Sequence, residues 1–511
     1  MDVAGNVSLG TPVETFPMDG KIFAGVYLHE KNNSAGKPKH HEDAELAIKC
    51  FRKLGCKIIG DVYDEGGASS VDDEELVIFN QKLTETEDSL EKFSTKNPDA
   101  CCYILYFIVP QEGSKFKTSD NYLDVIRLRE TIKNPETPVI FFIQDISSSV
   151  SPRPSMLLNT DKKDGGELKI PRSANVLVAY LPNPENLGVS VIKILTDELS
   201  KNLSIHNCLT NFNRVLIEKG CKPTPRFGST LIHQLYLQNG ESAKLPEEYS
   251  CKRKYLAYAF LFGKFSEERE EKLSDLSNLI EKDTESLKVL NHFGVELQFC
   301  VNDGRMTTEE FKKKLREILE SGDLDSCDGI FIIVSSHGNE NLTVYTYDGE
   351  FTIDFIRGEL AKCAKLKDKP KVIIGDACRG GDQEKSVSCN EVGHTLHTKD
   401  PRDATEGQKS GTTAGMYMNC CSIDMDDIII ALAAVEGKIA IPTPEHGSIF
   451  IYHLCQMIRE YNKLDFLSIL TLTMNKVSIR GTAGKQQVTF TSGLRKLLYF
   501  PKCEEQIMEY E

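Results

Sequence analysis

The sequence predicts an α/β protein made of two consecutive copies of one domain, each with a mostly parallel sheet and helices on both faces. In each half, short apolar runs typical of buried strands alternate with amphipathic segments typical of helices, and this alternation favours parallel sheets. The same order of segments occurs twice along the chain. A chain of 511 residues is also too long for a single hydrophobic core.

The first copy is predicted to span residues 21–237. After a strand that begins at Lys21, residues 41–55 have the periodicity of an amphipathic helix and end in the glycine typical of a helix C-terminus. Apolar runs at 106–109 and 138–143 then predict two buried strands. These segments give the first copy the alternation of strands and helices expected of a parallel sheet.

The second copy is predicted to span residues 254–502. A helix at 283–294 matches the first helix of the other copy, and another helix begins at Thr307 with the pattern of a capping box. Apolar runs at 330–334 and 371–375 predict two further buried strands. Neighbouring parallel strands end at the same edge of a sheet, where functional groups gather.

Four segments lack the periodicity of packed elements. Residues 1–20 are expected to be disordered, and residues 503–511 to form a tail. Residues 238–253 are polar and contain glycine and proline, so we interpret them as a linker. Residues 381–419 are polar and without apolar periodicity, which predicts a long exposed loop.

Two strands of the second copy each lead into a chemically reactive side chain. The strand at 330–334 is followed by His337, and the strand at 371–375 is followed by Cys378. At the ends of neighbouring strands, a thiol and an imidazole make a nucleophile and its base. For Cys378 taken alone, a buried and inert thiol is the alternative.

The first copy lacks both of these side chains. Ile146 stands at the position of Cys378, and Pro110 stands at the position of His337. Isoleucine is not a nucleophile, and proline has no ionisable group and no N–H. The first copy is therefore predicted to be catalytically dead at this site.

At these residues the chain resembles the caspases and their wider clan, the metacaspases and paracaspases. Caspases end one strand in Ser-His-Gly, found here at 336–338, and carry Gln-Ala-Cys-X-Gly on another, which corresponds to 376–380. The resemblance implies two caspase-like domains with six-stranded sheets, the first a pseudo-caspase. It also implies a cysteine endopeptidase with His337 and Cys378 as the catalytic residues. The backbone N–H groups of Gly338 and Cys378 would stabilise the oxyanion.

The substrate pocket departs from the caspase pattern. Caspases bind an aspartate side chain with two arginines and the motif glutamine, but these positions hold Ser277, Pro442 and Asp376, and the nearest arginine, Arg269, is out of register. A carboxylate at Asp376 would repel an acidic substrate. Metacaspases and paracaspases have an aspartate at this position and cleave after arginine or lysine, so Asp376 suits a basic side chain. A pocket that no longer binds substrate well is the alternative. Arg379 either helps to hold the loop after the cysteine or faces solvent, and we expect it to face solvent.

Two functions are consistent with this pattern. The first is a cysteine endopeptidase of apoptosis or immune signalling that acts on protein substrates. Because caspases dimerise through edge strands, the first copy would then serve as a tethered partner, by intramolecular domain pairing or in a homodimer. The second is a non-catalytic decoy that pairs with an active caspase or an adaptor. In caspases the stretch that corresponds to 381–419 is cut during maturation; an uncut loop is equally consistent with this sequence.

Composition excludes several other classes. The net charge is −15 and no basic stripe is present, so no nucleic acid partner is expected. The longest apolar stretch, at 428–435, is too short to span a membrane, and no signal peptide is expected at the first residues. The 16 cysteines form no Cys-x-x-Cys pairs, which predicts reduced thiols in the cytoplasm. No histidine cluster has ligand spacing, so neither a metal nor another cofactor is expected.

Overall fold

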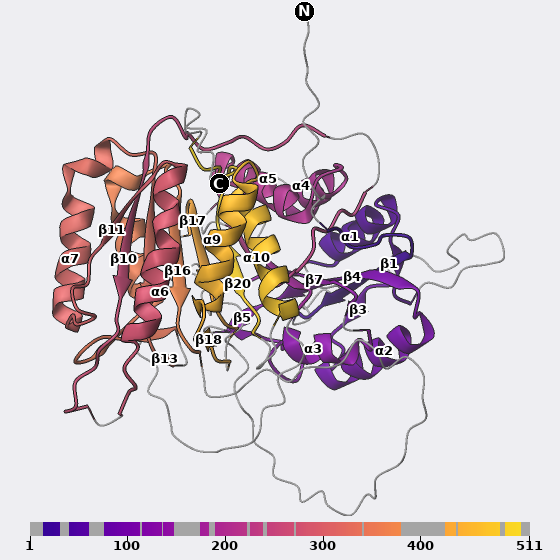
Figure 1. Ribbon diagram of the computed structural model, residues 1–511. Helices are drawn as coiled ribbons and strands as arrows, with labels where there is room; N and C mark the ends of the chain where they lie inside the picture. The colour runs from indigo at the N-terminus through magenta and orange to yellow at the C-terminus, as the bar shows by residue number, and fades with distance from the viewer. Residues whose placement is uncertain are drawn as a thin grey trace, which may run out of the picture.

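One sheet of 13 strands runs through the whole molecule (Figure 1). The computed structural model describes residues 14–30, 40–60, 76–112, 115–134, 136–147, 174–182, 190–221, 225–238, 243–269, 272–339, 342–379, 425–435, 438–480 and 486–501. The predicted 381–419 loop and the 503–511 tail lie outside these residues.

The amino-terminal half provides one side of the sheet, drawn from indigo to magenta in Figure 1. Its strands are β1 (Lys21–Leu28), β2 (Lys57–Ile58), β3 (Ile78–Phe79), β4 (Ala100–Val109), β7 (Val139–Asp145), β8 (Val176–Leu181) and β9 (Arg226–Ser229). They follow the order β2-β1-β4-β7-β8-β9, with β3 beside β1. All pairs in this half are parallel except β8 with β9, which is antiparallel.

The carboxy-terminal half repeats this pattern. Its strands are β10 (Tyr255–Leu261), β11 (Val295–Phe299), β12 (Gly329–Ser335), β16 (Lys371–Asp376), β17 (Ile428–Leu432) and β20 (Thr489–Ser492). They follow the order β11-β10-β12-β16-β17-β20, and only β17 with β20 is antiparallel. The predicted α/β class with a mostly parallel sheet is therefore confirmed.

The two halves meet where β9 pairs with β20 in antiparallel orientation. Phe227 lies opposite Ser492, and Ser229 lies opposite Phe490. Side-chain hydrogen bonds also cross this seam: Asn213 Nδ2 donates to the Leu494 carbonyl at 3.2 Å, and Gln234 donates to Ser468 Oγ at 2.8 Å. Because each last strand hydrogen-bonds to the other, neither has an open edge at the centre of the sheet.

Helices cover both faces of the sheet (Figure 1). They are α1 (His41–Lys53), α2 (Leu83–Lys96), α3 (Val125–Thr131), α4 (Val191–Leu199), α5 (Ile205–Glu218), α6 (Ser277–Leu287), α7 (Thr308–Glu320), α8 (Ile353–Lys362), α9 (Ile449–Tyr461) and α10 (Phe466–Arg480). Successive strand residues point to opposite faces, so Ala257 and Ala259 join one apolar cluster and Tyr258 joins another. The first cluster contains residues of α1, α4, α5, α9 and α10, so one continuous core spans both halves.

Local signals explain where several helices begin and end. At the start of α7, the Thr307 hydroxyl accepts the Glu310 N–H at 3.2 Å, and Glu310 Oε2 accepts the Thr307 N–H at 2.8 Å, which is the predicted capping box. After α1, Gly55 has a φ of +83°, a conformation that glycine adopts without strain. The helix predicted at 283–294 is different: α6 starts at Ser277, and residues Lys288–Phe293 form a 3₁₀-helix.

Two segments without apolar periodicity are nevertheless held in place. Residues 14–20 were expected to be disordered, but the Phe16 N–H donates to the Gln234 carbonyl at 3.0 Å and the Phe16 side chain is buried. The last part of the predicted linker is docked as well. The Tyr249 N–H donates to the Leu497 carbonyl at 2.9 Å, and the Tyr249 hydroxyl donates to Asp427 at 2.5 Å. In both segments a main-chain hydrogen bond and one aromatic side chain hold the chain in place, and the main-chain bond leaves no pattern in the sequence.

The helices within the described ranges are not long and apolar enough to cross a bilayer.

Candidate active site

Strands β12 and β16 bring His337 and Cys378 to the same edge of the sheet. Ser335 lies opposite Asp376 in the parallel register, and the Ser336 N–H donates to the Asp376 carbonyl at 3.1 Å. His337 and Cys378 each follow two residues after this matched pair. The structure therefore places the two predicted catalytic residues at adjacent strand ends, as the sequence led us to expect.

Gly338 holds this arrangement close together. A Cβ at this position would lie 2.5 Å from the Cys378 carbonyl oxygen and 2.7 Å from both the Ala377 Cβ and the Thr343 carbonyl oxygen. A Cβ atom does not approach other atoms this closely, so any side chain here would push the two strand ends apart. The backbone segments that carry the predicted oxyanion donors, Gly338 and Cys378, are thus in contact.

The His337 ring is oriented by Ser274, which precedes α6. His337 Nε2 lies 2.9 Å from the Ser274 carbonyl oxygen and 3.1 Å from its hydroxyl. A carbonyl can only accept, so Nε2 carries the proton and Nδ1 is left as the basic nitrogen. Phe265 packs against the ring with a centroid distance of 5.1 Å. Ser274 could not be found from the sequence, because any residue can supply the main-chain carbonyl that makes the shorter of these contacts.

The thiol of Cys378 is half-buried beside the segment that follows β17. Its Sγ donates to the Ala440 carbonyl at 3.8 Å. Burial raises the pKa of the Cys378 thiol, a backbone hydrogen bond with Ala440 lowers it, and the nearby Asp376 carboxyl raises it. The net effect is an elevated pKa, so the resting state of the sulfur is the protonated thiol.

A buried pair of carboxyl groups lies directly behind the nucleophile. Asp376 ends β16, and Asp283 reaches it from the middle of α6; both side chains are buried. Asp283 accepts hydrogen bonds from the Ser448 N–H at 2.8 Å and from the hydroxyls of Ser448 and Ser335 at 2.6 and 3.2 Å. Asp376 Oδ2 is buried without a hydrogen-bond partner in the described structure.

The two carboxyl groups affect each other's protonation. Burial, followed by the charge of Asp283, raises the pKa of Asp376 to about 8. Burial also raises the pKa of Asp283, although its serine donors oppose this shift. At neutral pH, Asp376 therefore holds its proton in the folded chain. Asp283 was missed from the sequence because it precedes Asp376 by almost a hundred residues and lies on a helix.

Neither of the two positions that hold a substrate-binding arginine in caspases supplies a cation beside Asp376, and Arg269 does not supply one either. Ser277 begins α6, and Pro442 lies in the short strand β18 (Pro442–Thr443). The guanidinium of Arg269 instead donates to the Gly349 carbonyl at 3.0 Å and stacks on Tyr345 at 4.9 Å. Within the described ranges, no lysine or arginine forms an ion pair with Asp376.

Arg379 is buried, so the expectation that it faces solvent was wrong. The main-chain N–H of Arg379 donates to the Lys438 carbonyl at 2.8 Å, and its guanidinium Nη1 donates to the Ala434 carbonyl at 3.3 Å. These bonds fasten the chain after β17 around the residue that follows the nucleophile. A charged side chain gives no sign in the sequence that neighbouring carbonyl groups will receive it.

The corresponding edge of the amino-terminal half contains no such pair. Val109 lies opposite Asp145, and Pro110 and Ile146 follow directly at the two strand ends. The next residues close on each other: the Gln111 N–H donates to Ser147 Oγ at 2.7 Å, and Ser147 Oγ donates to Asp145 at 2.7 Å. Neither Pro110 nor Ile146 has an ionisable side chain, so this edge has no nucleophile and base at these positions.

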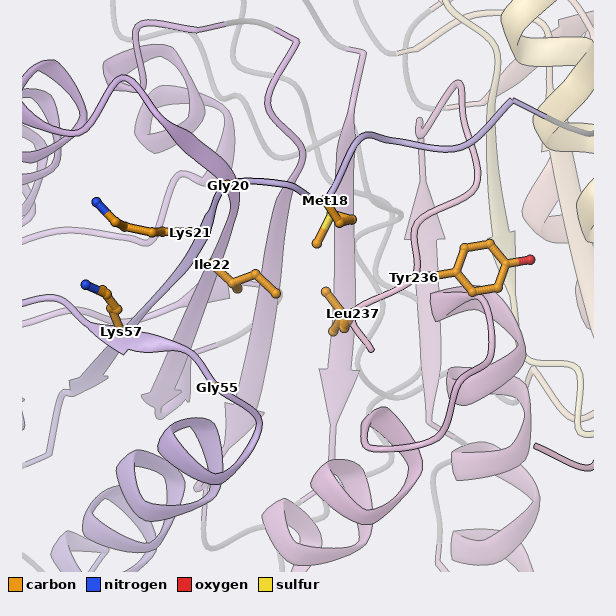
Figure 2. Close-up of a pocket in the computed structure, with 8 residues that line it drawn as sticks. All are labelled: Met18, Gly20, Lys21, Ile22, Gly55, Lys57, Tyr236 and Leu237. Atoms are coloured by element: carbon orange, nitrogen blue, oxygen red, sulfur yellow. The ribbon is translucent and has the colours of Figure 1, made fainter. Parts of the chain in front are cut away.

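The described residues show no metal site and no disulfide. No group of three or more ligating side chains gathers within them, and their cysteines are free thiols. A cavity of about 220 Å³ lies in the other half, at the beginning of β1, between Met18, Ile22 and Leu237 (Figure 2). It is at the amino-terminal strand ends, and its Lys21 is paired with Asp99 at 2.8 Å, so it does not belong to this site.

Comparison with known proteins shows the family of this chain. The family model for the caspase domain matches residues 270–499. Caspase-6 of Mus musculus is 31% identical over 214 residues, which cover 39% of this chain and 73% of that protein. The chain belongs to the caspase family. Caspase-8 of Mus musculus is 29% identical over 283 residues, covering 52% of this chain and 55% of that protein.

A solved caspase also resembles this chain. The structure of caspase-1 from Spodoptera frugiperda is 21% identical, and the match covers 53% of this chain and 99% of that one with a TM-score of 0.41. The family model matches within the carboxy-terminal half, which carries His337 and Cys378. At the level of the family, the family model and the caspase relatives support a cysteine-type endopeptidase.

Proposed function

We propose that this chain is a cysteine endopeptidase of caspase type, with Cys378 as the nucleophile and His337 as its base. The observation that carries the proposal is the matched register of β12 and β16, which delivers the two side chains to adjacent strand ends. Ser274 completes the arrangement by holding the Nε2 proton of His337. The chemistry expected of such a group is hydrolysis of a peptide bond in a protein substrate.

In the proposed reaction, Nδ1 of His337 takes the thiol proton as Sγ of Cys378 attacks the peptide carbonyl carbon. A carbon–sulfur bond forms, and the carbonyl oxygen becomes an oxyanion near the N–H groups of Gly338 and Cys378. The carbon–nitrogen bond then breaks, and His337 gives its proton to the leaving amine. Water hydrolyses the thioester and restores the thiol.

The proposed specificity follows from the carboxyl pair behind the nucleophile. An ionised carboxyl of this pair would repel an acidic substrate side chain beside it, in a region of low dielectric. A guanidinium or ammonium group would instead be attracted, and it would lower the raised pKa of Asp376 and favour its ionised form. We therefore propose cleavage after arginine or lysine.

The amino-terminal half is proposed to be a second, catalytically dead caspase-like domain that serves as a tethered partner. Its strand order matches that of the other half, while Ile146 and Pro110 replace the reactive residues. Through β9 and β20 it occupies the edge at which caspases dimerise. In this arrangement, pairing is intramolecular, and a homodimer through the same strands is excluded unless the seam opens.

The alternative function is a decoy that pairs with an active caspase in place of cleaving substrates. The seam weighs against it, because the edge such a decoy would offer is already filled by the chain itself. The loss of the two substrate-binding arginines, at Ser277 and Pro442, supports the decoy. A role in apoptosis or immune signalling and a cytoplasmic location remain proposals drawn from the family and from the cysteine composition.

A positional peptide library tests the proposal. Fluorogenic peptides that vary at the residue before the scissile bond are incubated with wild type and with Cys378→Ala. Cleavage after arginine or lysine by wild type alone supports the proposal. Cleavage after aspartate contradicts the proposed specificity, and absence of any cleavage supports the decoy.

A further inference from the structure

The peptide group between Ala440 and Ile441 lies against the nucleophile. Its carbonyl oxygen accepts the Cys378 thiol at 3.8 Å. In a trans peptide the carbonyl and the N–H point in opposite directions, so the Ile441 N–H points away from the sulfur. Whatever binds this N–H therefore determines whether the carbonyl faces Cys378.

Gln486 is the group that binds this N–H. Its Oε1 accepts the Ile441 N–H at 2.7 Å, and its Nε2 donates to the Ala433 carbonyl at 2.8 Å. The side chain is 3% exposed, so both bonds are shielded from water. A buried amide whose oxygen and nitrogen each have a main-chain partner has little freedom to turn, because turning would leave buried polar groups unpaired.

The other end of this bridge returns to the strand that carries the nucleophile. The Ala433 N–H donates to the Gly375 carbonyl at 2.9 Å, and Gly375 lies in β16, three residues before Cys378. A closed circuit of contacts thus runs from Cys378 through Ala440 and Gln486 to Ala433 and back to β16. Gln486 is the side chain of this circuit that links the 440–441 peptide to the strand of the nucleophile.

We infer that Gln486 is a positioning residue of the active site, which orients the 440–441 peptide so that its carbonyl covers the Cys378 thiol. The inference deepens the proposed protease function, since a peptide substrate must displace this carbonyl from the sulfur and then bind beside it. Without Gln486, the 440–441 peptide group rotates or moves away, so the Ala440 carbonyl no longer contacts the Cys378 thiol. A bound substrate then also lacks an ordered main-chain segment beside it.

Gln487 offers a matched control. It is the next residue, it is a glutamine with 2% exposure, and its Nε2 donates to the Val488 carbonyl at 2.9 Å, away from the 440–441 peptide. Gln487→Ala therefore removes a buried amide of the same size and leaves the cover of Cys378 intact. Gln486→Glu is the conservative variant, because its protonated carboxyl can still accept from Ile441 and donate to Ala433.

The test is the rate at which iodoacetamide alkylates Cys378, resolved from the other cysteines by peptide mass spectrometry. Loss of one hydrogen bond of ordinary strength predicts that Gln486→Ala reacts about five- to tenfold faster than wild type. Gln487→Ala should react at the wild-type rate. Gln486→Glu keeps an acceptor for the Ile441 N–H in either protonation state, so it should react more slowly than Gln486→Ala.

Two outcomes overturn the inference: equal alkylation rates for Gln486→Ala and wild type, or equal acceleration by Gln487→Ala. If Gln486→Ala does not fold, as judged by circular dichroism, Gln486→Met decides the question, because it fills a similar volume without an oxygen acceptor for the Ile441 N–H and should react faster than wild type. Alkylation needs no peptide substrate, so the result is independent of the proposed protease activity. A wild type that cleaves no peptide would contradict the proposed function while leaving the alkylation result to stand.

Discussion

Replacement of Asp376 by asparagine should make the protein more stable, by an amount that grows as the pH rises. In the folded chain, burial and then Asp283 raise the pKa of Asp376 to about 8, whereas the carboxyl of the unfolded chain has its ordinary value of 3.8. A group whose folded pKa is raised stabilises the folded state fully below the unfolded pKa. That contribution is lost as the pH rises from about 4 to about 8.

The size of the effect follows from proton release. Between pH 5 and pH 7, Asp376 is protonated when folded and ionised when unfolded, so unfolding releases one proton. Stability then falls by about 1.4 kcal/mol per pH unit, or about 2.7 kcal/mol over this range. Asparagine has the same shape and does not titrate. The free energy of unfolding of Asp376→Asn should therefore gain about 2.7 kcal/mol on wild type between pH 5 and pH 7.

The assay is urea unfolding followed by circular dichroism at pH 5, 6 and 7, because the chain has no tryptophan. Asp328→Asn is a control of opposite sign. Although burial raises the pKa of Asp328, hydrogen bonds from Ser250 and Arg253 lower it below its ordinary range. That variant should be less stable than wild type by a constant amount across these pH values. If the difference in free energy of unfolding between Asp376→Asn and wild type stays flat or shrinks as the pH rises, Asp376 is not protonated in the folded chain at these pH values.

Three further predictions concern the active site and the seam. Gly338→Ala should lower kcat/KM by at least about 100-fold, because a Cβ 2.5 Å from the Cys378 carbonyl displaces the strand ends; retained activity in a kinetic assay would show that the contact is not required. His337→Ala should lower kcat by about 10²- to 10⁴-fold, whereas Ser274→Ala, which keeps the carbonyl that holds Nε2, should change it by less than about tenfold. A fragment of residues 254–502 should cleave the same peptide more slowly than the full chain, because β20 loses its partner; equal rates would exclude a supporting role for the amino-terminal half.

Much of the fold follows from patterns in the sequence. The apolar runs that end before His337 and Cys378 are buried parallel strands, and the capping box at Thr307 starts a helix. These features depend on residues close together in the chain, which is why periodicity and turn chemistry are sufficient to predict them.

What the sequence did not predict depends on contacts between distant segments. Asp283 lies near Asp376 because hydrogen bonds from Ser335 and Ser448 hold its carboxylate at the strand ends, and Ser274 acts through a main-chain carbonyl that every residue has. Arg379 is buried because carbonyl groups after β17 receive it. Main-chain partners leave no mark on residue type, and the Asp283–Asp376 pair joins positions far apart in the chain, so neither spacing nor composition could indicate these three contacts.

The proposed cleavage by Cys378 after basic residues is tested most directly with two peptides. They differ only in the residue before the scissile bond, which is arginine in one and aspartate in the other. Because an ionised carboxyl beside the thiol would repel an aspartate side chain and attract an arginine side chain, wild type should cleave the arginine peptide with a kcat/KM at least about 100-fold higher; like charges at close range cost several kcal/mol. Cys378→Ala should cleave neither peptide. Faster cleavage of the aspartate peptide, or equal rates for wild type and Cys378→Ala, would contradict the account.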